Sequence, residues 1–147
     1  REVIEQFQLK FLNVQVQMVE AIISEAEGDY AAMADHYQQA IAEIQRSVVA
    51  GNLYLVLPQL YAELAEAQIE TGQLAEAEQS IAAGFLLDTA EPKLWFAKAR
   101  LQLSQDMPQL ALASVNYALA IWQDADAEYG EANEAKALGA ELTGHPQ

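Results

Sequence analysis

The chain has 147 residues, of which 52% are hydrophobic and 20% are charged, and it contains no cysteine. This composition excludes a disordered chain, disulfide bonds and thiolate metal sites. The net charge of −15 at pH 7 disfavours nucleic acid and anionic membranes as direct partners, and it favours a basic or neutral protein.

The first predicted helix runs from about Val3 to Ala26 and carries two apolar stripes at helical spacing. One stripe consists of Val3, Phe7, Phe11, Val14, Met18 and Ile22, and the other of Leu9, Leu12, Val16, Val19 and Ile23. Two stripes predict burial on two sides, one against the second helix and the other against the third helix or something outside this chain. Gly28 ends this helix, and Asp29 can cap the second helix, which runs from Tyr30 to about Ala50.

Gly51 and Asn52 interrupt the pattern before a third helix. We expect that helix to begin near Leu57, because Pro58 is tolerated only in a first helical turn, and to end at Glu70. Further helices are predicted at about 74–87, 92–103, 108–122 and 130–142, with an acidic connector at 124–129 before the last one. No apolar run approaches the ~20 residues that a membrane-spanning helix needs.

Small, aromatic and turn residues recur at a spacing of 34 positions in the second half of the chain. Ala65, Gly72, Leu74, Ala77, Ile81 and Gly84 recur as Ala99, Asp106, Pro108, Ala111, Val115 and Ala118, and Tyr61 recurs as Trp95. This register resembles that of the tetratricopeptide repeat (TPR) family. The resemblance implies an all-α fold, a right-handed superhelical α-solenoid of about three TPR-like helix pairs plus a C-terminal capping helix.

The predicted organisation is a single TPR-like domain over residues 1–147. Repeat 1 covers about 3–52, repeat 2 about 57–90, repeat 3 about 91–124, and the capping helix about 127–143. Gly28 and Gly72 are 44 positions apart, so repeat 1 has about ten extra residues, which should lengthen its second helix and the following turn. Because the chain begins at Arg1 without Met, we expect a segment of a longer, bacterial protein, located in the cytoplasm with the periplasm as an alternative.

The resemblance also implies a concave groove lined by the first helix of each pair. Its candidate peptide-binding residues are Gln15, Met18, Ile22, Gln59, Glu63, Glu66, Glu70, Phe96 and Arg100. Glu63, Glu66 and Glu70 share one helical face, and no Lys or Arg occurs between residues 47 and 92. We therefore predict an unneutralised acidic face that a Lys- or Arg-bearing segment would offset; the competing interpretation is a solvated face that only keeps the domain soluble.

One ligand known for the family does not fit this sequence. Members that bind chaperone tails clamp a carboxylate with Lys, Asn and Arg side chains. The corresponding positions here have Met18, Ile22 and Glu63, with Lys93 retained and Ala97 in place of Arg. We therefore do not expect that carboxylate ligand.

The sequence predicts no catalytic residue, metal site or cofactor. A lone histidine such as His36 cannot hold a metal ion. Asp124 opens an acidic run that resembles a calcium loop, but Gly130 comes one position late and Ala135 replaces the bidentate glutamate. No glycine-rich phosphate loop is present, and no nucleophile can be paired with a base.

The function predicted from the sequence is protein or peptide recognition through the groove. Two alternatives stay open. The first helix, apolar on two sides, could make the chain a homodimerisation module. The chain could also be the regulatory or sensor arm of a larger bacterial regulator, with a small effector as ligand.

Overall fold

The structure is a computed structural model that describes residues 2–46, 51–124 and 129–144. These residues form α-helices joined by turns and two 3-10 helices, and they include no strand. The elements are α1 (Glu2–Glu27), α2 (Tyr30–Arg46), η1 (Gly51–Val56), α3 (Leu57–Glu70), α4 (Leu74–Leu87), α5 (Pro92–Ser104), α6 (Pro108–Ile121), η2 (Trp122–Asp124) and α7 (Gly130–Gly144).

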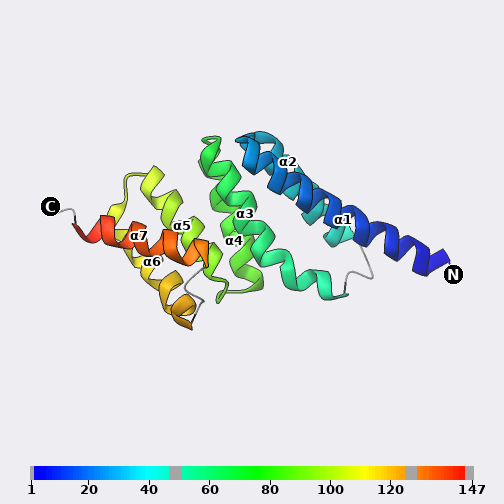
Figure 1. The fold of residues 1–147 in the computed structure, drawn as a ribbon. Helices are drawn as coiled ribbons and strands as arrows, with labels where there is room; N and C mark the ends of the chain where they lie inside the picture. The colour runs from blue at the N-terminus through cyan, green and yellow to red at the C-terminus, as the bar shows by residue number, and fades with distance from the viewer. Residues whose placement is uncertain (1, 47–50, 125–128, 145–147) are drawn as a thin grey trace.

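The helices are stacked as pairs along one direction (Figure 1). α1 packs on α2, α3 on α4, and α5 on α6, while α7 covers α6 at the far end. Successive pairs meet through α2 with α3, α3 with α5, and α4 with α5. α1 and α7 therefore lie at opposite ends of an elongated stack in which each pair buries apolar surface against the next.

Three turns between paired helices have the same backbone conformation. Gly28, Gly72 and Asp106 have φ angles of 74°, 75° and 61°. After each of them, the next amide donates to the carbonyl five residues earlier, at 2.7–2.8 Å. This is the hydrogen-bond pattern of a Schellman turn, in which the left-handed residue ends the helix. Asp106 can replace glycine because aspartate tolerates the left-handed region better than most residues do.

The same repetition appears inside the core. Ala65, Ala77, Ala99 and Ala111 are fully buried, which lets paired helices approach closely. Between the paired helices, the Ser80 hydroxyl donates to the Gln68 side-chain oxygen at 2.8 Å. The Ser114 hydroxyl donates to Gln102 in the same way, one 34-residue period later, at 2.7 Å. Each bond satisfies polar atoms that would be costly to bury alone.

The first pair differs from the other two. α2 has 17 residues, whereas α4 and α6 have 14 each, and η1 precedes α3. The predicted lengthening of the second helix is thus confirmed, while its predicted end at Ala50 lies outside the described residues. α3 begins at Leu57 as expected, with Pro58 in its first turn.

The second side of α1 does not pack on the third helix, which was one of the two partners expected for it; the other, something outside this chain, stays a prediction. Val14 and Ala21 are buried against α2. The second predicted stripe is exposed at Leu12, Val16, Val19 and Ile23, and Ile22 of the first stripe is exposed as well. The reason is positional, since α1 stands at the end of the stack and α2 covers only one of its sides. None of the described helices is long and apolar enough to cross a membrane.

Candidate functional site

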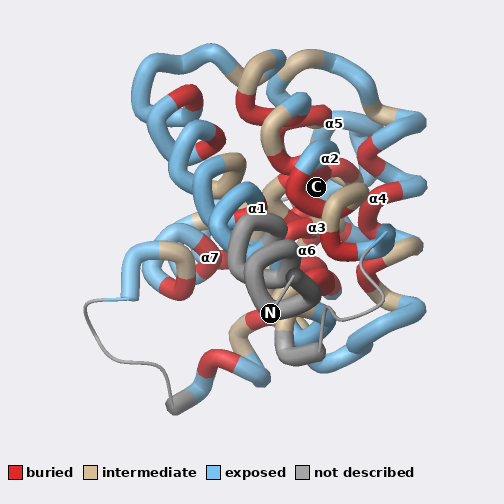
Figure 2. The backbone as a smooth tube through the Cα atoms, turned by 90° about the vertical axis from the view of Figure 1, so that its right-hand side faces the viewer, coloured by how far each residue is buried: buried red, intermediate tan, exposed pale blue. Residues whose placement is uncertain are grey.

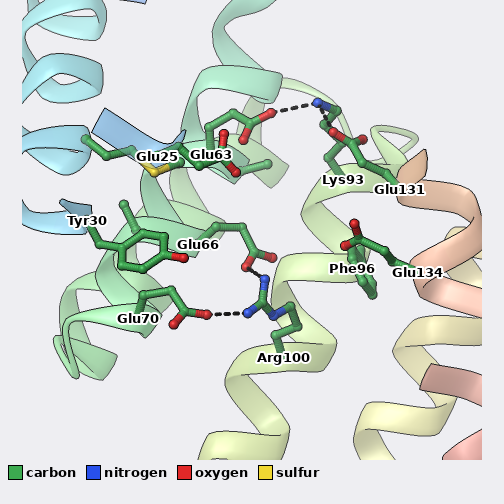
Figure 3. A pocket seen from close by; sticks show the side chains of 13 residues that line it. Glu25, Tyr30, Glu63, Glu66, Glu70, Lys93, Phe96, Arg100, Glu131 and Glu134 are labelled. Carbon is green, nitrogen blue, oxygen red and sulfur yellow. Dashed lines mark hydrogen bonds and ion pairs between the residues drawn. The ribbon is translucent and has the colours of Figure 1, made fainter. Parts of the chain in front are cut away.

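A cavity of about 180 Å³ opens between the first helices of the pairs. α3, α5 and α7 supply most of its lining, and the C-terminal end of α1 and the start of α2 close one side. Figure 3 shows the side chains that surround it. The lining residues are Glu25, Tyr30, Met33, Ala62, Glu63, Glu66, Ala67, Glu70, Lys93, Phe96, Arg100, Glu131 and Glu134.

A second cavity of about 460 Å³ adjoins the first one. The two share the lining residues Glu70, Phe96, Arg100 and Glu134. The second cavity adds apolar side chains from Ile69, Leu103 and Leu138. We refer to the two cavities together as the groove, which therefore has an acidic half and an apolar half.

Two cations from α5 reach into the acidic half, and each meets two glutamates (Figure 3). The Lys93 ammonium donates to Glu63 Oε1 at 2.6 Å and lies 2.6 Å from Glu131 Oε1. Arg100 Nη1 lies 2.5 Å from Glu66 Oε2, and its Nη2 donates to Glu70. Three ion pairs thus join α3 and α5, and in two of them, Glu63 with Lys93 and Glu70 with Arg100, the partners are 30 residues apart in sequence.

Glu66 is the most constrained of these glutamates. Its side chain is 18% exposed, yet both of its carboxylate oxygens are covered and accept no hydrogen bond of good geometry within the described structure. Its contact with Arg100 is an ion pair. Burial raises the pKa of Glu66 to about 7, with the Arg100 charge opposing the shift and the Glu63 and Glu70 charges adding to it.

The Glu63–Lys93 pair shows the same competition between burial and charge. Burial raises the pKa of Glu63, and the Lys93 charge only partly offsets that effect. Burial by itself would lower the pKa of Lys93, but the charges and hydrogen bonds of Glu63 and Glu131 outweigh it and raise that pKa. Lys93 is therefore held as a cation by its two glutamates.

The predicted unneutralised acidic face is wrong in one respect, because Lys93 and Arg100 neutralise part of it. Both cations lie beyond the acid-only stretch of sequence, and packing of α5 on α3 brings them to it. The cavity nevertheless contains more acids than bases. Six glutamates line it, at positions 25, 63, 66, 70, 131 and 134, against two cations. Among the described residues, Glu25 and Glu134 take part in no ion pair with the lining cations.

The structure brings five of the predicted groove residues together. Glu63, Glu66, Glu70, Phe96 and Arg100 line the acidic half, and three of them also line the apolar half. The other four predicted residues line neither cavity: Gln15, Met18, Ile22 and Gln59. α1 faces α2 along most of its described length, so only its end, with Glu25, reaches the groove.

Sequence reasoning missed Glu25, Glu131 and Glu134 as lining residues, and it placed Lys93 at a clamp position of the groove without pairing it with a glutamate. A usable signal existed for Lys93, which stands seven residues before Arg100, as Glu63 stands seven before Glu70. Two such pairs on the facing helices of adjacent repeats predict two ion pairs between those helices. The α7 glutamates carried no comparable signal, because their position depends on how the last helix packs.

Phe96 is held in place between the two halves of the groove. Its ring meets Trp122 edge to face, with centroids 6.2 Å apart and planes at 69°. Phe96 is 8% exposed, so it offers a small apolar contact on a fixed side chain. Such pairs restrict ring movement, which makes Phe96 a rigid part of the groove wall.

No metal-binding cluster of three or more His, Cys, Asp or Glu side chains occurs in the described part of the chain. His36 Nδ1 lies 2.8 Å from the Gln17 side-chain oxygen and so belongs to the α1–α2 contact. The acidic run that resembles a calcium loop, for which the sequence predicts no calcium binding, covers 124–130. Residues 125–128 of this run lie outside the described residues.

Comparisons with known proteins place the fold. No family model matches the sequence, and no curated protein matches it. Among solved structures, the Arabidopsis OM64 TPR domain is similar with a TM-score of 0.68 and 16% identity, covering 93% of this chain and 99% of that one. The first TPR domain of human RPAP3 has a TM-score of 0.65 and 15% identity, covering 88% of this chain and 92% of that one.

A third structure, the first TPR of Spaghetti (RPAP3), was solved bound to the HSP90 peptide SRMEEVD. It has a TM-score of 0.65 and 15% identity, covering 90% of this chain and 97% of that one. These similarities confirm the predicted fold, an all-α solenoid of the TPR type. At such low identity they concern the fold alone.

Proposed function

We propose that this domain is a peptide-binding scaffold whose groove takes a segment of a partner protein bearing Lys or Arg beside apolar residues. The observation that supports this most is the charge of the acidic half, where six glutamates surround two cations. Three of these glutamates are half-buried and three are exposed, so six like charges lie around two cations in the free protein, and a cation from a ligand would relieve their repulsion.

The occupied cations argue against an acidic ligand. Lys93 is bound by Glu63 and Glu131, and Arg100 by Glu66 and Glu70. A peptide carboxylate would have to displace one of these glutamates and would then lie among the others. The peptide SRMEEVD, seen on the Spaghetti TPR, has three acidic side chains and one arginine. We therefore propose a ligand of the opposite charge for this chain.

Each half of the groove has a distinct part in the proposed binding. Glu25 at the α1 end and Glu134 on α7 are exposed acids that would meet the incoming cation first. Glu66 would complete its ionisation as the cation approaches. Ile69, Leu103 and Leu138 would contact the neighbouring apolar side chain. Charge would then select the partner, and the apolar contact would fix the register of the segment.

A charge-reversal experiment tests this proposal. The probe is an acetylated and amidated peptide of alternating lysine and leucine, titrated by fluorescence anisotropy. Glu25→Lys with Glu134→Lys should weaken its binding at least about tenfold, since like charges then face the ligand. The matched control is Glu76→Lys with Glu78→Lys, which changes net charge equally at two exposed positions of α4 outside the groove. Equal weakening in both variants would show attraction by overall charge only and would overturn the proposal.

A further inference from the structure

The outer face of α1 carries a regular row of exposed apolar side chains. Leu12, Val16, Val19 and Ile23 are 45–56% exposed, and we call these four residues the α1 seam. Figure 2, which looks onto this end of the stack, shows the described part of α1 as largely exposed. On a monomeric protein a continuous apolar row of this kind is unusual, and such surfaces commonly mark an interface.

The seam lies on the side of α1 opposite its contact with α2. At about 100° per residue, Val14 and Ala21 point one way, and the four seam residues cluster around the opposite direction. Val14 is 1% exposed and Ala21 is fully buried, in agreement with this geometry. α2, the helix that packs closely with α1, therefore lies on the side opposite the seam, and the seam faces outward.

The spacing of the seam is that of a helix-pairing surface. Its residues follow one another at intervals of four, three and four, which keeps apolar side chains on one line where two helices cross at a small angle. The four seam residues recur on one side of α1 over about three helical turns. A second helix with the same spacing is therefore the occupant that this surface fits best.

We propose that the α1 seam binds the α1 seam of a second copy of this chain, with the two helices running in opposite directions. The spacing reads the same from either end, so turning one copy around places Leu12 against the partner's Ile23 and Val16 against the partner's Val19. The two larger pairs then lie at the ends and the two valine pairs at the centre. Each seam residue thus meets a side chain of similar size.

The charges of α1 favour this direction over a parallel pair. Glu20, Glu25 and Glu27 lie after the middle of the seam, where the helix has no basic residue. The one lysine of α1, Lys10, lies before the seam with Glu2 and Glu5. A parallel pair would bring these two acidic ends together, whereas opposite directions hold them apart. Opposite directions also pair the helix dipoles favourably.

The proposed dimer leaves the groove open. Glu25 is the α1 residue that lines the groove, and its direction from the helix axis is close to that of Val14, on the side away from the seam. Self-association and peptide binding therefore use separate surfaces. The two proposals can fail independently of each other.

The size of the seam sets the expected strength of the dimer. From Leu12 to Ile23 the helix rises about 17 Å, so the contact is at the small end of stable protein interfaces. We expect a dissociation constant in the micromolar range, on the order of 10–100 µM. Association should then be visible between a few micromolar and a few hundred micromolar protein.

Sedimentation equilibrium of the whole chain over that concentration range tests the dimer. The wild type should shift from monomer to dimer, and Val16→Glu with Val19→Glu should remain monomeric with unchanged helical content. The control is Leu86→Glu, which replaces another exposed apolar residue, on α4, and should leave the dimer intact. A monomeric wild type, or loss of the dimer only in the Leu86 variant, would overturn the proposal.

Crosslinking tests the direction, since the chain has no cysteine of its own. Val16→Cys mixed with Val19→Cys should form a disulfide-linked dimer under mild oxidation, because those positions oppose each other in the proposed pair. Val16→Cys alone should crosslink at least about tenfold more slowly. Faster crosslinking of the single variant would indicate a parallel pair and contradict the proposed arrangement.

Discussion

The groove and the outer face of α1 invert the usual distribution of side chains. In the groove, Glu66 is a largely covered carboxylate, at a place where apolar residues would be the ordinary choice. On α1, four aliphatic side chains face outward where polar residues would be ordinary. Each departure from the rule that polar groups lie outside has a cost for the isolated chain. The groove and the α1 seam are thus surfaces of opposite chemistry. A bound cation would lower the cost of the groove carboxylates, and an apolar partner would lower the cost of the exposed seam.

Removing a cation from the groove should have the largest effect on stability. Arg100→Ala leaves Glu66 and Glu70 without their counter-ion, and because these side chains are only partly buried we expect a loss of about 2 kcal/mol in the free energy of unfolding at pH 8. The loss should be smaller at pH 5, where Glu66 is protonated. Urea unfolding at both pH values measures it, with Arg46→Ala, at the exposed end of α2, as the control. Equal losses in the two variants would mean that the Arg100 ion pairs do not contribute to stability.

Neutralising Glu66 should have the next largest effect, with the opposite sign. The pKa of Glu66 is about 7 in the folded chain and near 4.5 when unfolded, so the folded state binds more protons between these values. Stability from this group is therefore greatest below pH 4.5 and falls as pH rises to about 7. Glu66→Gln should raise the free energy of unfolding by about 2 kcal/mol at pH 8 and change it little at pH 4.

Urea unfolding at a series of pH values checks the Glu66 prediction. The difference between Glu66→Gln and the wild type should grow through the interval from pH 4.5 to 7. Glu76→Gln on α4, which removes a carboxylate at an exposed position, is the control. A destabilised Glu66→Gln variant at pH 8 would show that the Arg100 ion pair outweighs the burial of the carboxylate.

The two faces of α1 allow a smaller but closely matched comparison. Val14 and Val16 are the same residue type two positions apart, one buried and one exposed. Val14→Ala should cost about 1–2 kcal/mol, because it leaves a space in the α1–α2 core. Val16→Ala should change the stability of the dilute monomer by less than about 0.5 kcal/mol. Thermal unfolding at low micromolar concentration measures both, and similar costs would mean that the seam is covered within the monomer.

How far the sequence could predict these features depends on whether they are local. Neighbouring residues determine the left-handed turn at Gly72 and the start of α3 at Leu57. The 34-residue register follows from residue types that recur along the sequence. The structure contains all three features. The exposure of Val19 was not predictable from its helical stripe. A stripe indicates an apolar face, and only the place of the helix in the stack decides whether anything covers it.

The groove was predictable to the extent that it lies on one helix. Glu63, Glu66 and Glu70 share a face of α3, and their spacing gave them directly. Their neutralisation by Lys93 and Arg100 depends on the contact between α3 and α5, which the acid-only stretch concealed. The 34-residue register shows which positions of the repeats correspond, but it does not predict which charged side chains of adjacent repeats form ion pairs.

Calorimetric titration of the wild-type chain shows whether the groove selects a basic segment. The ligands are the lysine–leucine peptide and SRMEEVD, each at pH 6 and pH 8 in buffers of different ionisation enthalpy. We expect binding of the basic peptide, stronger at pH 8 and with proton release near pH 6–7 as Glu66 ionises, and no binding of SRMEEVD. Tighter binding of SRMEEVD, or basic-peptide binding without proton release, would contradict this expectation.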